Sequence, residues 1–341
     1  MTAQVRYGDI LRKVMAGESM SRQETHATFG QIMDGQWGES QIAGLLVALA
    51  AKGETVDEIA GAAEAMRDHV VRIDTGGADV IDTCGTGGTG LSTFNISTAA
   101  AFVAAGAGAK VAKHGNRTNT RASGSANVLA ALGVNLDAAP PTLSRCLAEA
   151  GICFCYAIRH HPAMKYAAPV RKALGVRTIF NVLGPLTNPA GATRQVMGIF
   201  DGRLTETIAR VLGLLGTERA LVVHAADGLD EIATTSETKV SEWRDGQVTT
   251  RTVKPEDFRL PRARLDDLMV DSAEASAAVV LEVLAGAKGP ARDVVLLNAA
   301  AALTVAGQAQ TIAEAIPLAE HAIDAGAANE ALSKLVEFSN E

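Results

Sequence analysis

The sequence predicts an α/β protein, in which a small all-helical domain is joined to a larger α/β domain with a central mixed, mostly parallel sheet. Two patterns predict this architecture. Residues 1 to 73 carry helical signals throughout, whereas from residue 78 apolar strand-like runs alternate with helix-like segments. The chain has 341 residues, of which 48% are hydrophobic, so it can bury a core large enough for two such domains.

Capping boxes mark helix starts in the first region. In Ser21-x-x-Glu24 and Thr55-x-x-Glu58, each side chain of the pair can bond a backbone N–H group that a helix leaves unpaired. Gly53 follows the helix-like run 41–52 as a C-cap. The run Asp74-Thr75-Gly76-Gly77 then reads as the connection to the α/β region.

The α/β region alternates strands with helices. Strands are predicted at 79–83, 109–113, 152–156, 194–200 and 219–224, with helices at 97–107, 124–132, 142–150 and 204–215. Residues 240–253 resemble a hairpin that turns at Asp245-Gly246, and residues 272–338 are alanine-rich and helical. The segment from 160 to 187 interrupts the alternation. We therefore predict a helical domain of residues 1–73, joined by about 162–187, and an α/β domain of residues 78–161 and 188–341.

Charge and cysteine usage limit the functional classes. The formal net charge is −7, whereas a general nucleic-acid binder is usually basic, so no nucleic-acid partner is expected. The sequence shows neither a secretory signal pattern nor an apolar run of about 18 residues, so we expect a cytoplasmic protein with no membrane partner. Cysteines 84, 146, 153 and 155 show neither CxxC nor zinc-ligand spacing and read as buried, reduced thiols.

A glycine-rich run follows the first predicted strand. Gly85-x-Gly87-x-x-Gly90 matches the bare pattern of a dinucleotide-binding loop. Two observations count against NAD: the next helix begins near Ser97, and the next strand ends in Lys113-His114, where an acidic ribose-binding residue is expected. The run also lacks the Gly-Lys-Ser/Thr ending of a P-loop. A loop for another phosphate ligand and a tight turn without a ligand both stay open.

The segments around this loop favour phosphate. The run Thr93-Phe94-Asn95-Ile96-Ser97-Thr98 brings hydroxyl and amide donors to a helix start, where the helix dipole attracts an anion, although a simple N-cap would look the same. The run Lys113-His114-Gly115-Asn116-Arg117 adds two permanent cations at a strand end, and a second small-residue turn follows at Ser123-Gly124-Ser125. Together these segments predict a phosphate-binding site.

These motifs, in this order, resemble those of the anthranilate phosphoribosyltransferase family. They are GTGG at 85–88, FNIST at 94–98, KHGNR at 113–117, SGSA at 123–126, HPAMK at 161–165, APVR at 168–171, RTIFN at 177–181, GPLTNP at 184–189, DGLDE at 227–231 and LNAA at 297–300. The resemblance covers nearly the whole chain. It implies a nucleoside phosphorylase/phosphoribosyltransferase-like fold, with the site in a cleft between the helical domain and a phosphoribosyl-binding α/β domain.

The resemblance also implies an activity. The reaction would transfer the phosphoribosyl group of 5-phosphoribosyl 1-diphosphate (PRPP) to anthranilate in tryptophan biosynthesis, with Mg²⁺ as cofactor. A homodimer would form through the helical domain.

Carried over residue by residue, the resemblance assigns three sets of site residues. The PRPP set is Gly85, Gly88, Thr89, Thr93, Asn95, Ile96, Ser97, Thr98, Lys113, His114, Gly115, Asn116, Arg117 and Ser125. The anthranilate set is Gly85, His114, Asn116, Arg171 and Pro185, and the metal set is Ser97, Asp230 and Glu231. Two positions depart from the family pattern, because Thr89 and Asn127 stand where the family usually has Asp.

The chemistry of the assigned residues suits this reaction. Asp230 and Glu231 are hard oxygen donors of the kind that Mg²⁺ binds beside phosphate oxygens, and Arg171 can hold a carboxylate. Alone, the acidic pair would equally suit a solvated turn, and the arginine an ordinary helix surface. His114 is a candidate proton acceptor. Two other functions stay open: a pyrimidine nucleoside phosphorylase of the same fold, and an inactive paralogue that binds nucleic acid.

Overall fold

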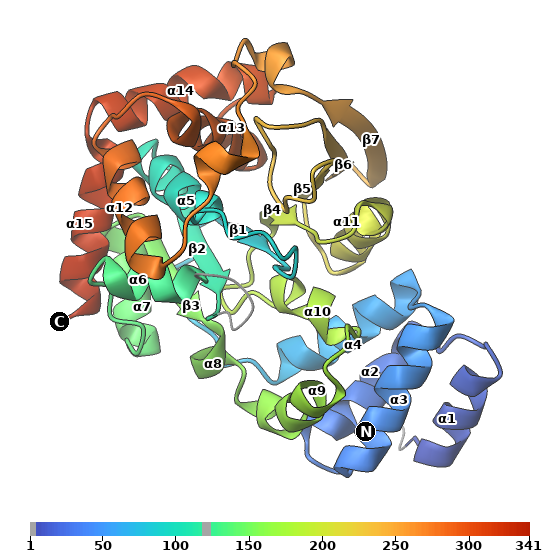
Figure 1. Ribbon diagram of the computed structural model, residues 1–341. Helices are drawn as coiled ribbons and strands as arrows, with labels where there is room; N and C mark the ends of the chain where they lie inside the picture. Colours follow the sequence, from blue (N-terminus) through green and yellow to red (C-terminus); the bar gives the residue numbers. More distant parts are fainter. Residues whose placement is uncertain (1–4, 118–123) are drawn as a thin grey trace.

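The computed structural model describes residues 5–117 and 124–341 and is built on a seven-stranded sheet (Figure 1). The strand order is β3-β2-β1-β4-β5-β6-β7, in which β1 to β5 run parallel and the last two pairings are antiparallel. The strands are β1 Val80–Gly85, β2 Lys110–Gly115, β3 Ile152–Tyr156, β4 Arg194–Gly198, β5 Arg219–Ala225, β6 Thr238–Arg244 and β7 Gln247–Val253. The predicted mixed, mostly parallel sheet beside a small helical unit is therefore confirmed.

Helices precede the sheet, cover it and end the chain (Figure 1). The N-terminal helices are α1 Tyr7–Met15, α2 Arg22–Met33, α3 Glu39–Lys52 and α4 Val56–Asp68. The α/β region adds α5 Ile96–Gly106, α6 Ser125–Ala131, α7 Pro140–Glu149, α8 Ala157–His160, α11 Thr205–Leu214, α12 Ala273–Leu284, α13 Pro290–Val305, α14 Ile312–Asp324 and α15 Ala327–Ser339. The inserted segment holds η1 Pro162–Tyr166, α9 Ala168–Leu174, α10 Phe180–Leu183 and η2 Gly184–Leu186, and the remaining short turns are η3 Gly202–Leu204, η4 Pro255–Phe258 and η5 Leu265–Leu268.

The side chains of β5 alternate between two hydrophobic cores. Ala220 and Val222 pack into a core shared with α11 and the N-terminal helices, whereas Leu221 and Val223 pack on the other face with α5, α13 and α14. A strand that is buried on both faces needs this period of two. The helical unit therefore shares its core with one face of the sheet.

Residues 162–187 lie against the N-terminal helices. Val170, Ile179 and Leu183 are buried in the same core as the helices α2 to α4. The Phe180 ring centroid lies 5.7 Å from that of Phe29 on α2. This insertion consequently forms one packed unit with the N-terminal helices.

The sheet reverses its chain order beside β1. β1 pairs with β2 on one side and with β4 on the other, where Gly85 lies opposite Gly198. Connections that leave two adjacent parallel strands in opposite directions open a crevice at their carboxyl ends. The glycine loop begins at this crevice.

The predicted hairpin is confirmed, with a longer first strand. Its turn is Asp245-Gly246, whose φ angles of 52° and 78° suit a two-residue hairpin loop. β6 begins at Thr238, two residues earlier than expected, because Thr238 pairs with Ala225 at the end of β5.

The cysteine prediction is also confirmed: Cys84, Cys146, Cys153 and Cys155 are free and buried. Burial raises the pKa of the Cys84 thiol well above its ordinary value, so the protonated thiol is favoured. In the described part of the chain, none of the helices has both the length and the apolar character to cross a membrane.

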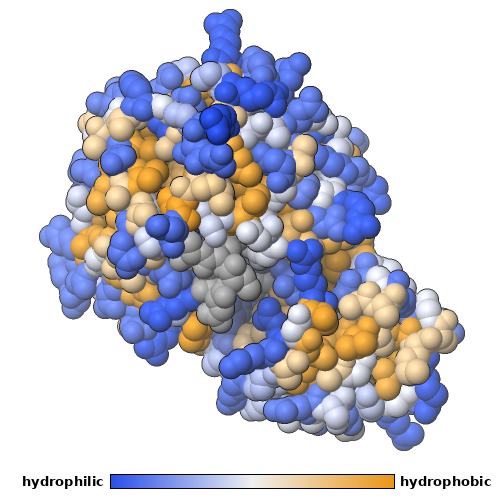
Figure 2. All heavy atoms as spheres, in the orientation of Figure 1, coloured by the Kyte–Doolittle hydropathy of each residue, from blue (hydrophilic) through white to orange (hydrophobic). Residues whose placement is uncertain are grey.

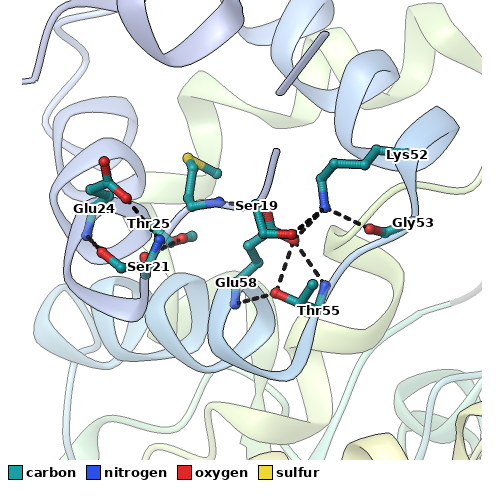
Figure 3. A network of polar contacts seen from close by, with 9 residues as sticks. Ser19, Ser21, Glu24, Thr25, Lys52, Gly53, Thr55 and Glu58 are labelled. Atoms are coloured by element: carbon teal, nitrogen blue, oxygen red, sulfur yellow. Dashed lines mark hydrogen bonds and ion pairs between the residues drawn. The ribbon is translucent and has the colours of Figure 1, made fainter. Parts of the chain in front are cut away.

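Both predicted capping boxes are present, and the second extends into a buried polar network (Figure 3). Glu58 is fully buried, and its carboxylate accepts hydrogen bonds from the Lys52 ammonium at 2.8 Å and from the backbone N–H groups of Thr55 at 2.8 Å and Met20 at 3.1 Å. This carboxylate therefore joins the start of α4 to the end of α3 and to the residues before α2.

Replacing Glu58 tests this network. Glu58→Gln should lower the free energy of unfolding by about 3 kcal/mol, because it leaves the nearly buried Lys52 ammonium without its counter-charge. Urea unfolding of the variant measures the change. Glu18→Gln, an exposed position of the same unit, is the control and should unfold like the unmodified chain. Equal stability of both variants would contradict the role given to Glu58.

Candidate active site

A cavity of about 530 Å³ lies at the carboxyl ends of β1 and β2. Figure 2 shows a hollow between the larger lobe and the helical lobe. The lining residues come from the glycine loop, the start of α5, the end of β2, the turn before α6, the α9–α10 connection and the loop after β5. They are Cys84, Gly85, Thr86, Gly87, Gly88, Gly90, Thr93, Phe94, Asn95, Ile96, Ser97, Lys113, His114, Gly115, Asn116, Arg117, Gly124, Ser125, Gly175, Val176, Arg177, Asn181, Asp230 and Glu231.

The glycine loop is held against Asp230. The backbone N–H of Gly87 donates to the Asp230 carboxylate at 3.0 Å. A Cβ atom on Gly85 would lie 2.6 Å from that carboxylate, and one on Gly198 would lie 1.7 Å from the Asp230 carbonyl oxygen. Both strand ends therefore need glycine so that Asp230 can approach the loop.

Lys113 brings a buried positive charge to the floor of the cavity. Only 2% of its surface is exposed. Its ammonium donates to the Thr83 carbonyl and, at 3.2 Å, to the Ser97 hydroxyl in the first turn of α5. Burial lowers the pKa of Lys113, while the charges of Asp82 and Glu231 act to raise it. The carboxylates therefore help to keep a cation at this position.

Asp82 joins three segments beneath the cavity. Its carboxylate is fully buried and accepts from the His114 backbone N–H at 3.0 Å and from the Asn188 side-chain amide at 2.8 Å. The same amide donates to the Ala112 carbonyl at 2.8 Å. Burial raises the pKa of Asp82, whereas the bond from Asn188 acts to lower it. The bonds tie the ends of β1 and β2 to the residues after η2.

His114 and His161 form a buried pair whose Nε2 atoms lie 3.2 Å apart. Burial lowers the pKa of His114 well below its ordinary value and lowers that of His161 to about 4, with neighbouring histidines adding to both shifts. A backbone bond to Gly184 also engages the His114 ring. Because Nε2 of His114 faces His161 and burial disfavours a charged ring, this geometry favours a hydrogen-bonding role over proton transfer.

The family models match both parts of the chain. Residues 8–70 match the helical bundle domain of a glycosyl transferase family, and residues 77–329 match the a/b domain of a glycosyl transferase family.

Two curated relatives match this chain over nearly its full length. The anthranilate phosphoribosyltransferase of Thioalkalivibrio sulfidiphilus is 52% identical over 329 residues, which cover 96% of this chain and 97% of the relative. That of Anaeromyxobacter sp. is 53% identical and covers 96% of both chains. The chain belongs to the anthranilate phosphoribosyltransferase family.

Solved structures of anthranilate phosphoribosyltransferases share the fold. That from Thermus thermophilus superimposes with a TM-score of 0.93 at 40% identity and covers 98% of this chain and 100% of its own. The Saccharomyces cerevisiae enzyme, solved in complex with PRPP and Mg, has a TM-score of 0.90 at 27% identity, with 98% of each chain covered.

Most residues carried over from the anthranilate phosphoribosyltransferases line the cavity, and four do not. The lining ones are Gly85, Gly88, Thr93, Asn95, Ile96, Ser97, Lys113, His114, Gly115, Asn116, Arg117, Ser125, Asp230 and Glu231. The others are Thr89, Thr98, Arg171 and Pro185. Ser123, named with the second turn, falls outside the described residues.

The four residues outside the lining have other surroundings. The Thr89 hydroxyl accepts the Leu91 N–H at 3.3 Å within the loop, and Thr98 is fully buried in α5. The Arg171 guanidinium lies 5.4 Å from the Phe180 ring centroid, and burial lowers its pKa. The buried Pro185 accepts a bond from the Gln195 amide at 2.8 Å through its carbonyl.

The connection between α9 and α10, together with the start of α10, adds lining residues that the sequence does not predict. Gly175, Val176, Arg177 and Asn181 line the cavity from the helical side. The run 177–181 is one of the family motifs, but nothing local in it indicates that Arg177 reaches the glycine loop. That contact depends on how the insertion packs.

The buried histidines predict a dependence of stability on pH. Below about pH 6.5 the unfolded chain takes up a proton that the buried His161 ring excludes, so the contribution of His161 to the free energy of unfolding should fall until about pH 4. For His161 alone, the loss between pH 7.5 and pH 5 is about 2 kcal/mol. Urea unfolding at the two pH values measures it.

His161→Gln should reduce that loss, because glutamine does not titrate. The exposed His321→Gln on α14 is the control and should keep the full dependence. An identical pH dependence in both variants would show that His161 is not a source of the effect.

Proposed function

We propose that the protein transfers the 5-phosphoribosyl group of PRPP to the amine of anthranilate, giving N-(5-phosphoribosyl)anthranilate and diphosphate in tryptophan biosynthesis. The observation that carries this proposal is the convergence of Lys113, the start of α5 and the Asp230–Glu231 pair on one cavity. A buried cation and a helix N-terminus suit phosphate groups, and the acidic pair suits a metal that accompanies them. Near-full-length relatives with this activity in their name support the choice of substrates.

PRPP would occupy the glycine-loop side of the cavity. Its proposed partners are the residues carried over from the family, with the backbone of Gly85 and Gly88, the hydroxyls of Thr93 and Ser97, and the charge of Lys113 nearest the phosphates. The Ser97 hydroxyl already accepts from Lys113 at 3.2 Å, so its own proton stays available for an anion. Thr89 and Thr98 would act from outside the lining.

The carboxylates of Asp230 and Glu231, with the Ser97 hydroxyl, would hold Mg²⁺. Among the described residues, no group of three or more His, Cys, Asp or Glu side chains could hold a metal ion. Mg²⁺ fits this donor set, because it commonly takes one or two carboxylates and completes its shell with substrate phosphates and water. When bound, the ion would neutralise charge that develops on the departing diphosphate.

Anthranilate would enter from the side of the helical unit. The Arg171 guanidinium, partly buried on α9, would bind its carboxylate, while His114, Asn116 and Pro185 would line the approach. The aromatic amine is a neutral nucleophile at pH 7, so it needs positioning beside the anomeric carbon more than deprotonation. The cations around the phosphates then stabilise charge on the leaving group, which is the main electrostatic demand of the reaction.

We further propose the assembly and location that the family resemblance implies. The helical domain would comprise residues 1–73 joined by about 162–187, with 78–161 and 188–341 forming the phosphoribosyl-binding domain. A cytoplasmic homodimer would form through the helical domain. Met15 and Val47 are 72% and 46% exposed on α1 and α3, and Figure 2 shows apolar side chains gathered on the helical lobe. Light scattering of the purified chain tests the dimer.

Loss of anthranilate fluorescence on incubation with PRPP and MgCl₂ tests the activity. The unmodified protein should consume anthranilate, and Lys113→Met should lower kcat/KM by about 100-fold, because it removes a buried charge beside the leaving group. Lys110→Ala is the control, since Lys110 lies in the same strand and bonds the Leu147 and Ala148 carbonyls instead. Phosphorolysis of uridine without anthranilate consumption would overturn the proposal.

Thr89→Asp tests the departure in the glycine loop. A carboxylate beside the proposed diphosphate site should lower the KM for PRPP about fivefold at saturating Mg²⁺ and raise it when Mg²⁺ is scarce, since the uncompensated charges then repel. Thr89→Asn keeps the shape without the charge and is the control. Identical Mg²⁺ dependence in the two variants would mean that charge at this position is unimportant.

A further inference from the structure

The connection between α9 and α10 reaches from the helical unit to the glycine loop. Gly175 ends α9 with a φ of 62°, and Val176 is 60% exposed at the cavity. The next side chain, Arg177, spans the cleft: its Nη2 donates to the Gly88 carbonyl at 2.8 Å. Its guanidinium carbon lies 4.3 Å from the ring centroid of Phe200, just beyond β4.

The glycine loop depends on anchors of this kind. Gly87, Gly88 and Gly90 have φ angles of 63°, 75° and 78°, and glycine backbones are the least restricted in conformation. Anchors from the α/β side include the bonds from Gly87 N–H to Asp230 at 3.0 Å, from Thr86 N–H to the Gly198 carbonyl at 2.9 Å, and from Phe200 N–H to the Thr86 hydroxyl at 3.0 Å. Arg177 holds the loop from the opposite wall.

The Gly88 carbonyl presents an electrostatic difficulty at an anion site. Gly88 lines the cavity, and a carbonyl oxygen carries partial negative charge that would repel a phosphate. A guanidinium bonded to that oxygen cancels the repulsion and still has other N–H donors. The same bond fixes the orientation of the peptide between Gly88 and Thr89. In a planar trans peptide the N–H points opposite to the carbonyl, so the direction of the Thr89 N–H is fixed as well.

We infer that Arg177 is a positioning residue for PRPP, which holds the Gly88 peptide and screens its carbonyl from the diphosphate. This inference rests on the proposed transferase function. Arg177 would thereby make the shape of the phosphate loop depend on the helical unit, to which its own segment is packed. This role requires a planar guanidinium, because one group must donate to the Gly88 carbonyl and lie over the Phe200 ring at the same time.

Steady-state kinetics of Arg177→Gln tests the inference. The KM for PRPP should rise about tenfold, with kcat and the KM for anthranilate changed less than twofold, since one charged hydrogen bond to the loop is lost. Arg177→Lys keeps the positive charge but lacks the planar guanidinium. Its KM for PRPP should lie between those of the unmodified protein and of Arg177→Gln. Arg203→Gln is the control, because Arg203 is exposed and pairs with Asp201 at 2.7 Å away from the cavity lining.

Thermal unfolding with inorganic diphosphate and MgCl₂ gives a readout that needs no turnover. Diphosphate should raise the melting temperature of the unmodified protein and of Arg203→Gln, and raise that of Arg177→Gln much less. Unchanged PRPP kinetics and an unchanged diphosphate shift in Arg177→Gln would overturn the inference. An equal rise in the KM for PRPP and in the KM for anthranilate, together with a lowered melting temperature of the variant, would also overturn it, because these changes indicate a merely structural role.

If the unmodified protein does not consume anthranilate, the proposed function fails. The shift of the melting temperature with diphosphate still reports on Arg177 in that case.

Discussion

The buried Asp82 carboxylate is the interaction on which the rest of the site depends. Burying a carboxylate costs several kcal/mol unless hydrogen bonds satisfy it, so Asp82 requires both the His114 N–H and the Asn188 amide. These partners come from β2 and from the segment after η2. Their meeting sets the ends of β1 and β2 side by side. As a result, Lys113 contacts Ser97 at the start of α5, and His114 lies beside His161.

The same arrangement gives the cavity two chemically different walls. The sheet side carries Lys113, Asp230, Glu231 and the first turn of α5, which together suit a highly charged ligand. The opposite side belongs to the insertion that packs with the N-terminal helices, and it meets the sheet side through Arg177. A site divided in this way suits two ligands of different charge, since a phosphorylated sugar can lie against the charged wall and an aromatic acid against the other.

The sequence allowed prediction of features that depend on local residues. The glycine loop, the start of α5 and the basic end of β2 each follow from a short run, and so do the capping boxes and the hairpin turn. Arg177 could not be found in this way, because its contact with Gly88 spans 89 positions and depends on the packing of the insertion. Thr98 shows the converse: it follows Ser97 in the motif, but one helical step of about 100° turns it into the core.

Gly85 and Gly198 show that a sequence motif identifies only some of the residues that a site requires. Gly85 belongs to a visible glycine run, whereas Gly198 ends β4 without any such signal. They are paired in register, and Asp230 passes over both. At Gly85 an added Cβ would meet a carboxylate oxygen that a side-chain rotation can move, but at Gly198 it would meet backbone that cannot move without the loop. The stricter requirement for glycine is therefore at Gly198 on β4, which lies outside the glycine motif. The reason is that the Asp230 backbone passes directly over this strand end.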